Sequence, residues 1–215
     1  MIKAVIFDMD GVLIDSEPLH LDYAFKLFKE LNITMTPNEY SKFIGTTSLY
    51  MWSNIKDKYN LENTVESLIN KERNGFFEFL SSPNTNIKPI DYIPELLGSL
   101  KENNFKTAVA SSSPMRVIKY IINNFELEKQ FNELVTGDYV ERSKPNPDIF
   151  LYAAKKLEVL PEQCVVIEDS HNGVLAAKNA GMKCIGFKNP NSGNQDLSKA
   201  DTIIHSFNEI DILNL

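Results

Sequence analysis

Six short apolar runs, each too short for a helix, constrain the fold of this chain more than any other feature. They lie at residues 4–7, 107–110, 133–135, 164–167, 184–187 and 202–207. Between most of them lie segments with the apolar spacing of an amphipathic helix, at residues 94–104, 114–125, 146–157 and 172–181. Strands that alternate with helices form a parallel sheet with right-handed crossovers. The sequence therefore predicts an α/β fold with a doubly wound, Rossmann-like parallel sheet.

One interval breaks this alternation and contains helical patterns only. These patterns lie at residues 17–31, 48–59 and 64–80, and a segment rich in Ser, Pro and Asn follows at 81–89. Two strands separated by a long segment that contains only helices indicate an inserted domain. We therefore predict a core domain of residues 1–15 and 82–215, and a helical domain of residues 16–81.

Charge and cysteine content narrow the classes of partner and compartment. The net charge is −7 and the sequence has no long basic run, so nucleic acid and anionic membranes are not expected partners. The N-terminal apolar run is too short for a signal peptide, and no stretch approaches membrane-spanning length. Cys164 and Cys184 both lie in apolar, strand-like segments and are expected to be buried free thiols in a reducing compartment. We expect a cytoplasmic protein.

Asp8 and Asp10 follow the first apolar run directly. Side chains at i and i+2 of an extended chain point to the same side, so these two carboxylates are expected to lie together where the strand leaves the sheet. Ligands of open α/β sheets bind at that edge. Two adjacent negative charges are tolerated beside a divalent cation, or when the pKa of one is raised. A polar turn that merely caps a strand explains these residues equally well.

Two further segments supply groups that suit a phosphate. Ser111, Ser112 and Ser113 follow an apolar run and precede a helical segment, where hydroxyl and N–H groups bind anions. Serine also caps helices without any ligand. Lys144 lies in a proline-containing loop before another helical segment and is able to pair with phosphate. A loop lysine is also commonly just solvated.

A second acidic pair, Glu168 and Asp169, follows the run at 164–167. On an acidic protein, two more carboxylates at a strand end favour a cation between the strands. Mg²⁺ prefers oxygen ligands, which fits Asp8 and Asp169 as direct ligands. The three histidines are far apart in the sequence and show no zinc spacing.

The order of these motifs resembles the haloacid dehalogenase superfamily. DMDGV matches its first motif, SSS the second, SKPNPDIF the third and VVIEDSHNGVLAAKNAGM the fourth. The helical insertion resembles the small four-helix cap that follows the first motif in this superfamily. The segments DMDGVLIDSEPLH and EDSHNGVLAA are most similar to the branch that contains β-phosphoglucomutase-like enzymes and sugar phosphatases.

This resemblance implies a role for each motif residue. Asp8 would be the nucleophile that forms an aspartyl-phosphate, and Asp10 the general acid and base. Ser111, Ser112 and Lys144 would bind the phosphoryl group. The Mg²⁺ ligands would be Asp8, the main-chain carbonyl of Asp10, Asp169 and Glu168, the last directly or through water.

The resemblance also bears on the choice between a mutase and a phosphatase. His20 matches the cap histidine of the mutase. However, Ser48 and Glu78 stand where the mutase has a cationic residue, and Pro114–Met115 replaces its Lys–Asn pair. A mutase needs a cationic site for a second phosphate, and three candidate residues for that site are missing.

We therefore predict a Mg²⁺-dependent phosphatase acting on a small phosphorylated metabolite, a sugar or polyol phosphate. The alternatives are a phosphosugar mutase and, more remotely, a non-catalytic binding module. Thr46, Thr47, Trp52 and Glu78 are candidate substrate contacts in the helical domain, together with His20. The aromatic and Met residues of that domain are expected to form its core, and a monomer is expected.

Overall fold

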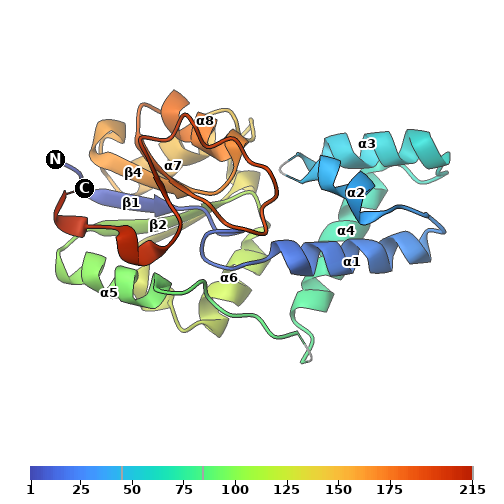
Figure 1. Ribbon diagram of the computed structural model, residues 1–215, viewed down its shortest axis with the longest axis horizontal. Coiled ribbons are helices and arrows are strands. Elements are labelled where there is room, and N and C mark those ends of the chain that lie inside the picture. Colours follow the sequence, from blue (N-terminus) through green and yellow to red (C-terminus); the bar gives the residue numbers. More distant parts are fainter. Residues whose placement is uncertain (45, 84, 215) are drawn as a thin grey trace. The chain divides into compact units, whose positions relative to one another are not determined.

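The computed structural model of the protein describes residues 1–44, 46–83 and 85–214 (Figure 1). The chain divides into two compact units: Met1–Asp15 with Lys88–Leu215, and Ser16–Ile87. We call them the sheet unit and the helical unit. None of the described helices combines the length and apolar content that a membrane crossing requires.

The sheet unit contains a six-stranded parallel sheet, as the apolar runs predict. Its strand order is β3-β2-β1-β4-β5-β6, with every neighbouring pair parallel. The strands are β1 (Ala4–Phe7), β2 (Lys106–Ser111), β3 (Glu133–Thr136), β4 (Cys164–Glu168), β5 (Lys183–Phe187) and β6 (Thr202–Ile204). Since β1 lies between β2 and β4, the strand order reverses beside β1. A ligand-binding crevice is expected at the carboxyl end of a strand in this position.

Helices cover both faces of the sheet (Figure 1), which confirms the doubly wound fold. They are α5 (Ile93–Glu102), α6 (Met115–Asn124), α7 (Asp148–Lys156) and α8 (His171–Asn179). Short 3-10 turns lie at Glu128–Gln130, Gly137–Tyr139, Pro161–Gln163, Phe207–Glu209 and Ile212–Asn214. In Figure 1, α7 and α8 lie on one face and α5 and α6 on the other. The core under α7 and α8 is rich in alanine, which allows these helices to pack closely on the strands.

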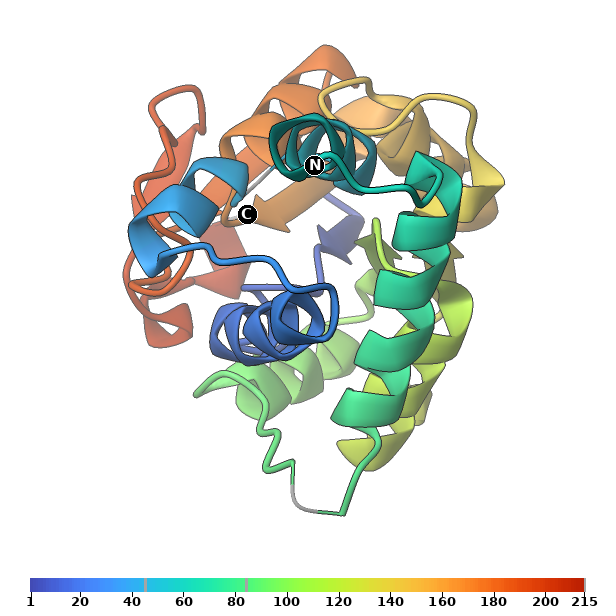
Figure 2. The ribbon, with the colours of Figure 1, turned by 90° about the vertical axis from the view of Figure 1, so that its right-hand side faces the viewer.

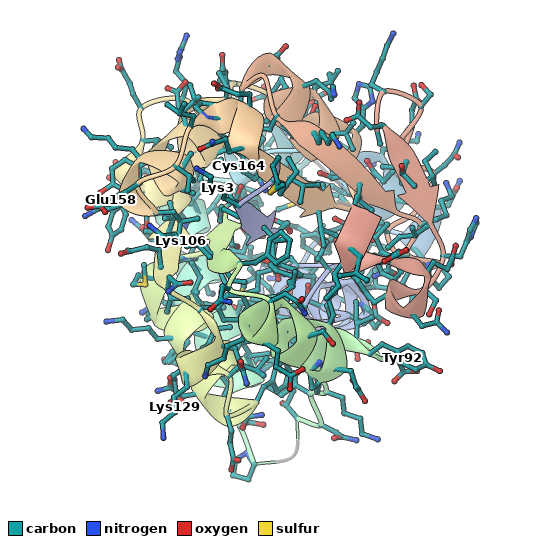
Figure 3. All side chains as sticks on the ribbon, turned by 90° about the vertical axis from the view of Figure 1, so that its left-hand side faces the viewer. Lys3, Tyr92, Lys106, Lys129, Glu158 and Cys164 are labelled. Atoms are coloured by element: carbon teal, nitrogen blue, oxygen red, sulfur yellow. The ribbon has the colours of Figure 1, made fainter. Side chains whose placement is uncertain are left out.

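The two cysteines are free and buried in this core, as predicted. Burial raises the pKa of Cys164 to about 11 and that of Cys184 to about 12, so both remain neutral thiols near neutral pH. Figure 3 looks onto the edge of the sheet where the strands begin, with Lys3, Lys106 and Cys164 labelled. Here the Lys106 N–H donates to the Lys3 carbonyl and the Lys3 N–H to the Gln163 carbonyl, which pairs the strands from their first residues. The predicted site residues of this unit lie at or after the opposite ends of the strands.

The helical unit contains α1 (Glu17–Glu30), α2 (Pro37–Tyr40), α3 (Ser48–Tyr59) and α4 (Val65–Leu80), with a 3-10 turn at Ser41–Phe43. Helix α4 packs against both α1 and α3. Figure 2 shows α1 and α3 nearly end-on, with α4 running across them. Threonine caps begin three of the helices, because Thr36, Thr47 and Thr64 each accept a hydrogen bond from a first-turn N–H. Identifying the two units with a catalytic core and a cap remains a prediction.

The division between the units falls at residue 88, whereas the sequence suggested residue 82. Residues after α4 remain bonded to that helix: the Thr85 hydroxyl donates to the Phe79 carbonyl at 2.7 Å. The chain pairs with the sheet unit from Pro89 onward, which forms an antiparallel bridge with Ile14, and the Ile90 N–H donates to the Leu13 carbonyl at 2.9 Å. Residue 84 of the predicted linker lies outside the described residues.

Candidate active site

The turn after β1 positions two carboxylates at the reversal of the strand order. Asp8 follows β1 directly, and its N–H donates to the Ile167 carbonyl of β4 at 3.0 Å. The turn closes where the Gly11 N–H donates to the Ile14 carbonyl at 2.8 Å. Gly11 has a φ of +80°, a conformation that favours glycine. The side chain of Asp8 is buried, while Asp10 is partly exposed.

Lys144 lies against the carboxylates of two strand ends. Its Nζ donates to Asp8 Oδ1 at 2.6 Å, to Glu168 Oε1 at 2.7 Å and to the Ala110 carbonyl at 3.3 Å. The Lys144 side chain is only 9% exposed, so these ion pairs are shielded from water. Lys144 thus holds Asp8 and Glu168 together and is not a solvated loop lysine.

Asp8, Glu168 and Asp169 form a compact acidic cluster. Each offers one carboxylate oxygen, and these oxygens lie within 4.8 Å of one another. Glu168 Oε2 accepts hydrogen bonds from the N–H and the hydroxyl of Ser170, both at 2.9 Å. Asp169 Oδ2 accepts one from the hydroxyl of Ser192. Both acidic side chains at the end of β4 are therefore held by a neighbouring serine, Glu168 by Ser170 and Asp169 by Ser192.

The charges of this cluster fit a divalent cation. Burial raises the pKa of Asp8 to about 8, Glu168 and Asp10 add to the rise, and Lys144 opposes it. Burial also disfavours the charged form of Lys144, but Asp8 and Glu168 outweigh this effect and raise its pKa above the usual value. When all three carboxyl groups are ionised, Lys144 balances only one of them. Oxygen ligands with excess negative charge suit Mg²⁺.

Two of the three consecutive serines contact Asp10. The Ser113 hydroxyl donates to Asp10 Oδ2 at 2.8 Å and that of Ser111 at 3.3 Å, while the Ser113 N–H donates to Ser111 Oγ at 3.0 Å. Ser111 is buried, whereas Ser112 is exposed. Ser113 was one of three candidate phosphate-binding serines, but the resemblance implied a role only for Ser111 and Ser112, and the contact of Ser113 with Asp10 was not predicted. The alternation of side chains along an extended chain was the available signal, since it places residues 111 and 113 on one side.

The predicted residues of the helical unit belong to α1, to α3 and the residues just before it, and to α4. The His20 ring stacks on that of Phe76, with ring centroids 4.0 Å apart. Thr46 and Thr47 are exposed; the Thr46 hydroxyl donates to the Phe43 carbonyl and Thr47 caps α3. The burial of Trp52 contradicts the prediction that this residue contacts a substrate. It is fully buried and donates from Nε1 to Glu72 at 2.9 Å, so it belongs to the core of this unit.

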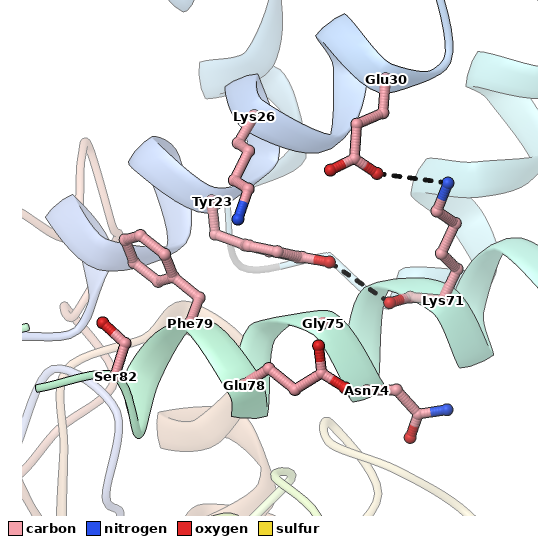
Figure 4. A pocket seen from close by; sticks show the side chains of 9 residues that line it. All are labelled: Tyr23, Lys26, Glu30, Lys71, Asn74, Gly75, Glu78, Phe79 and Ser82. Carbon is pink, nitrogen blue, oxygen red and sulfur yellow. Dashed lines mark hydrogen bonds and ion pairs between the residues drawn. The ribbon is translucent and has the colours of Figure 1, made fainter.

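Glu78 lies on a pocket within the helical unit (Figure 4). The pocket has a volume of about 450 Å³ and lies between α1 and α4. Its other lining residues are Tyr23, Lys26, Glu30, Lys71, Asn74, Gly75, Phe79 and Ser82. The Tyr23 hydroxyl donates to the Lys71 carbonyl at 3.3 Å across the pocket. The lining carries charges of both signs.

Gly173 sets the space that Glu168 occupies, so Gly173→Ala is expected to destabilise the fold by about 1–3 kcal/mol. A Cβ at this position would lie 1.8 Å from Glu168 Oε1. Glu168 is held by Lys144 and Ser170 and cannot turn away without breaking these contacts. Urea unfolding measures the change. Gly98→Ala in α5 is the matched control, because its Cβ would meet nothing within 4 Å. This control is expected to stabilise the helix by about 0.5–1 kcal/mol. If Gly98→Ala destabilised the protein and Gly173→Ala did not, the argument that Glu168 fills the space beside Gly173 would be wrong.

Comparisons with known proteins agree with this geometry. A family model described as haloacid dehalogenase-like hydrolase matches residues 5–187. The chain is 32% identical over 186 residues to a phosphorylated carbohydrates phosphatase of Thermotoga maritima, covering 85% of this chain and 83% of that protein. It is 32% identical over 193 residues to a β-phosphoglucomutase of Bacillus subtilis, covering 86% and 82%. Among solved structures, CbbY of Rhodobacter sphaeroides in complex with phosphate aligns with a TM-score of 0.84 at 26% identity, covering 97% of this chain and 96% of that one.

Proposed function

The chain belongs to the haloacid dehalogenase-like hydrolase family, and from that membership we propose that it is a Mg²⁺-dependent phosphatase acting on a small sugar or polyol phosphate. The observation that carries the proposal is the contact of Asp8 with Lys144 beside the carboxylates of Glu168 and Asp169. The relative from Thermotoga maritima, whose name describes a phosphatase of phosphorylated carbohydrates, supports the substrate class.

Asp8 is the proposed nucleophile. Lys144 binds Oδ1 of its carboxylate, which leaves Oδ2 to attack phosphorus. A bond forms between this oxygen and phosphorus as the bond to the leaving alkoxide breaks, giving an aspartyl-phosphate. Water then attacks the phosphorus, releases inorganic phosphate and regenerates the Asp8 carboxylate.

Asp10 is the proposed general acid and base. It gives a proton to the leaving alkoxide in the first step and takes one from the attacking water in the second. Ser111 and Ser113 both donate to its Oδ2, and these bonds orient the carboxyl group. Asp10 thus ends the two steps in the protonation state in which it began.

The remaining groups bind the phosphoryl oxygens and the metal. Asp8, Glu168, Asp169 and the Asp10 main-chain carbonyl would hold Mg²⁺, which when bound polarises the phosphoryl oxygens and reduces their repulsion from Asp8. Lys144 contributes a fixed positive charge beside the nucleophile. Ser112 offers an exposed hydroxyl to the phosphoryl group, and Ser111 would do so when its hydroxyl, which here donates to Asp10, turns to the substrate. His20, Thr46, Thr47 and Glu78 remain the proposed substrate residues of the helical unit.

A phosphosugar mutase is the second candidate, favoured by the match to the β-phosphoglucomutase of Bacillus subtilis. In that reaction the aspartyl-phosphate passes its phosphoryl group to a hydroxyl of the sugar and not to water. Holding a bisphosphorylated sugar requires cationic groups for a second phosphate. Ser48, Glu78 and Pro114–Met115 provide none at the positions where the resemblance led us to expect them.

A substrate panel separates the two activities. Purified protein with Mg²⁺ is assayed against sugar and polyol phosphates, including β-glucose 1-phosphate with a trace of glucose 1,6-bisphosphate. Free phosphate and glucose 6-phosphate are both followed, and EDTA-treated protein is the control. Phosphate release that requires Mg²⁺ is the expected result. Formation of glucose 6-phosphate without phosphate release would instead identify a mutase.

Asp10→Ala is expected to slow the hydrolysis of alkyl phosphates by about 10²–10⁴-fold, since their alkoxide leaves only when it is protonated. p-Nitrophenyl phosphate has a leaving group that departs without a proton, so its release from the variant should be slowed much less. The ratio of the two kcat/KM values measures this difference. An equal loss for both substrates would argue against Asp10 as the acid.

A further inference from the structure

We propose that Ser192 is a positioning residue that aims Asp169 at the divalent cation, and that residues 189–195 form a bracket for this purpose. These residues follow β5 and lie outside the four motifs that resemble those of the superfamily. The inference rests on the metal site of the proposed function. It adds a residue that acts through Asp169 and not by contact with the metal.

Ser192 encloses one oxygen of Asp169. Its side chain is buried, and its hydroxyl donates to Asp169 Oδ2. Gly11 covers the same oxygen from another side, because a Cβ there would lie 2.0 Å from Asp169 Oδ2 and 3.0 Å from Ser192 Oγ. Ser192 and Gly11 therefore restrict how the Asp169 carboxylate can turn.

The bracket holds Ser192 in place from the side of α8. Gln195 Nε2 donates to the Ser192 carbonyl at 3.1 Å. Gln195 Oε1 in turn accepts from the N–H of His171, the first residue of α8, at 3.0 Å. Ser192 is thereby tied to the segment that carries Glu168 and Asp169, so the loop and the acidic pair are held in a fixed relation.

The bracket also reaches the turn after β1. Asn189 is buried and donates from Nδ2 to the Gly11 carbonyl at 3.0 Å, while its Oδ1 accepts from the Asn191 N–H at 2.8 Å. Asn191 Nδ2 donates to Asp15 Oδ2 at 2.6 Å. One loop therefore contacts both strand ends whose carboxylates repel each other in the acidic cluster. Such contacts to metal-ligating side chains fix their orientation and strengthen metal binding.

Mg²⁺ binding tests the proposal without any assay of activity. Isothermal titration calorimetry gives the Kd of Mg²⁺ for the wild type, Ser192→Ala and Asp169→Asn. Ser192→Ala is expected to weaken binding by about 10–100-fold, the range typical of groups that orient a metal ligand. Asp169→Asn is expected to weaken it at least as strongly, because it changes the ligand itself.

Thr107→Val is the matched control for a general loss of stability. Thr107 is also buried and donates to the Gln130 carbonyl, but it lies near the start of β2, at the end of the strand away from the site. We expect this variant to lower Tm in EDTA and to keep the wild-type Mg²⁺ affinity. A comparable loss of affinity in Thr107→Val would overturn the role of Ser192.

The remaining outcomes separate this inference from the proposed function. Wild-type affinity in Ser192→Ala, with binding lost in Asp169→Asn, would overturn the role of Ser192 and leave the metal site intact. Unchanged affinity in Asp169→Asn, or no binding by the wild type, would overturn both. Weakened binding in Ser192→Ala, with Thr107→Val like the wild type, is the result we expect.

Discussion

Asp8→Asn is expected to reduce turnover by on the order of 10³-fold or more, the scale on which loss of a catalytic nucleophile acts. An amide is a poor nucleophile and cannot form the acyl-phosphate that the proposed mechanism requires. Asparagine keeps the size of the side chain and an oxygen that can accept from Lys144 Nζ, so the fold should survive. The loss is therefore expected in kcat and not in the amount of folded protein.

Two measurements check this prediction. Steady-state phosphate release is compared for the wild type, Asp8→Asn and the control Asp57→Asn, an equivalent change at an exposed position of α3. Acid-quenched samples with substrate are then examined by mass spectrometry for a phosphorylated peptide containing residue 8. Turnover near the wild-type rate in Asp8→Asn, or phosphorylation at another residue, would exclude Asp8 as the nucleophile.

Lys144→Met is expected to destabilise the protein by about 3–5 kcal/mol in the absence of a divalent cation, because breaking a buried ion pair leaves an uncompensated charge. Methionine approximates the length of lysine but carries no charge. Asp8 and Glu168 would then be buried together without the ammonium group that lies 2.6 and 2.7 Å from them. A bound cation would supply part of the missing charge, so Mg²⁺ should reduce the difference from the wild type.

Urea unfolding in EDTA and in Mg²⁺ measures this effect. Lys178→Met is the matched control, since Lys178 pairs with Asp201 at 2.6 Å but both side chains are well exposed, at 34% and 46%. An exposed pair contributes only about 0–1 kcal/mol. Equal losses in the two variants would contradict the role of burial at Lys144.

The pH dependence of Lys144→Met has a defined sign. Lys144 lowers the pKa of Asp8, so its removal lifts that pKa further above the value in the unfolded chain. An acid whose folded-state pKa is raised contributes stability below its unfolded pKa, and this contribution is lost as pH rises toward the folded one. The deficit of Lys144→Met in EDTA should therefore grow as pH rises above about 8, the pKa of Asp8 in the wild type, because Asp8 ionises there in the wild type but not yet in the variant. A deficit that shrinks would indicate that the carboxylates find another partner.

The positions of the strands and the identity of most candidate groups could be predicted from the sequence. The run at 164–167 predicted β4 to within one residue, because a strand buried on both faces is a continuous apolar segment. In a parallel sheet all strands end at the same edge. Polar residues that directly follow such runs, such as Asp8, Ser111 and Glu168, were thus expected to meet there.

Only the tertiary structure decided which of these groups touch, and where the helical unit ends. Lys144 contacts Asp8 across 136 positions of sequence, and Asn189 contacts Gly11 across 178. Ser192 and Ser113 resemble ordinary loop serines until the folded chain places them on Asp169 and Asp10. Trp52 was a candidate substrate contact from the sequence, but its side chain is buried in the helical unit. The physical reason is one of range: apolar periodicity acts between near neighbours and is visible along the chain, whereas the partner of a polar side chain is determined by how the elements pack.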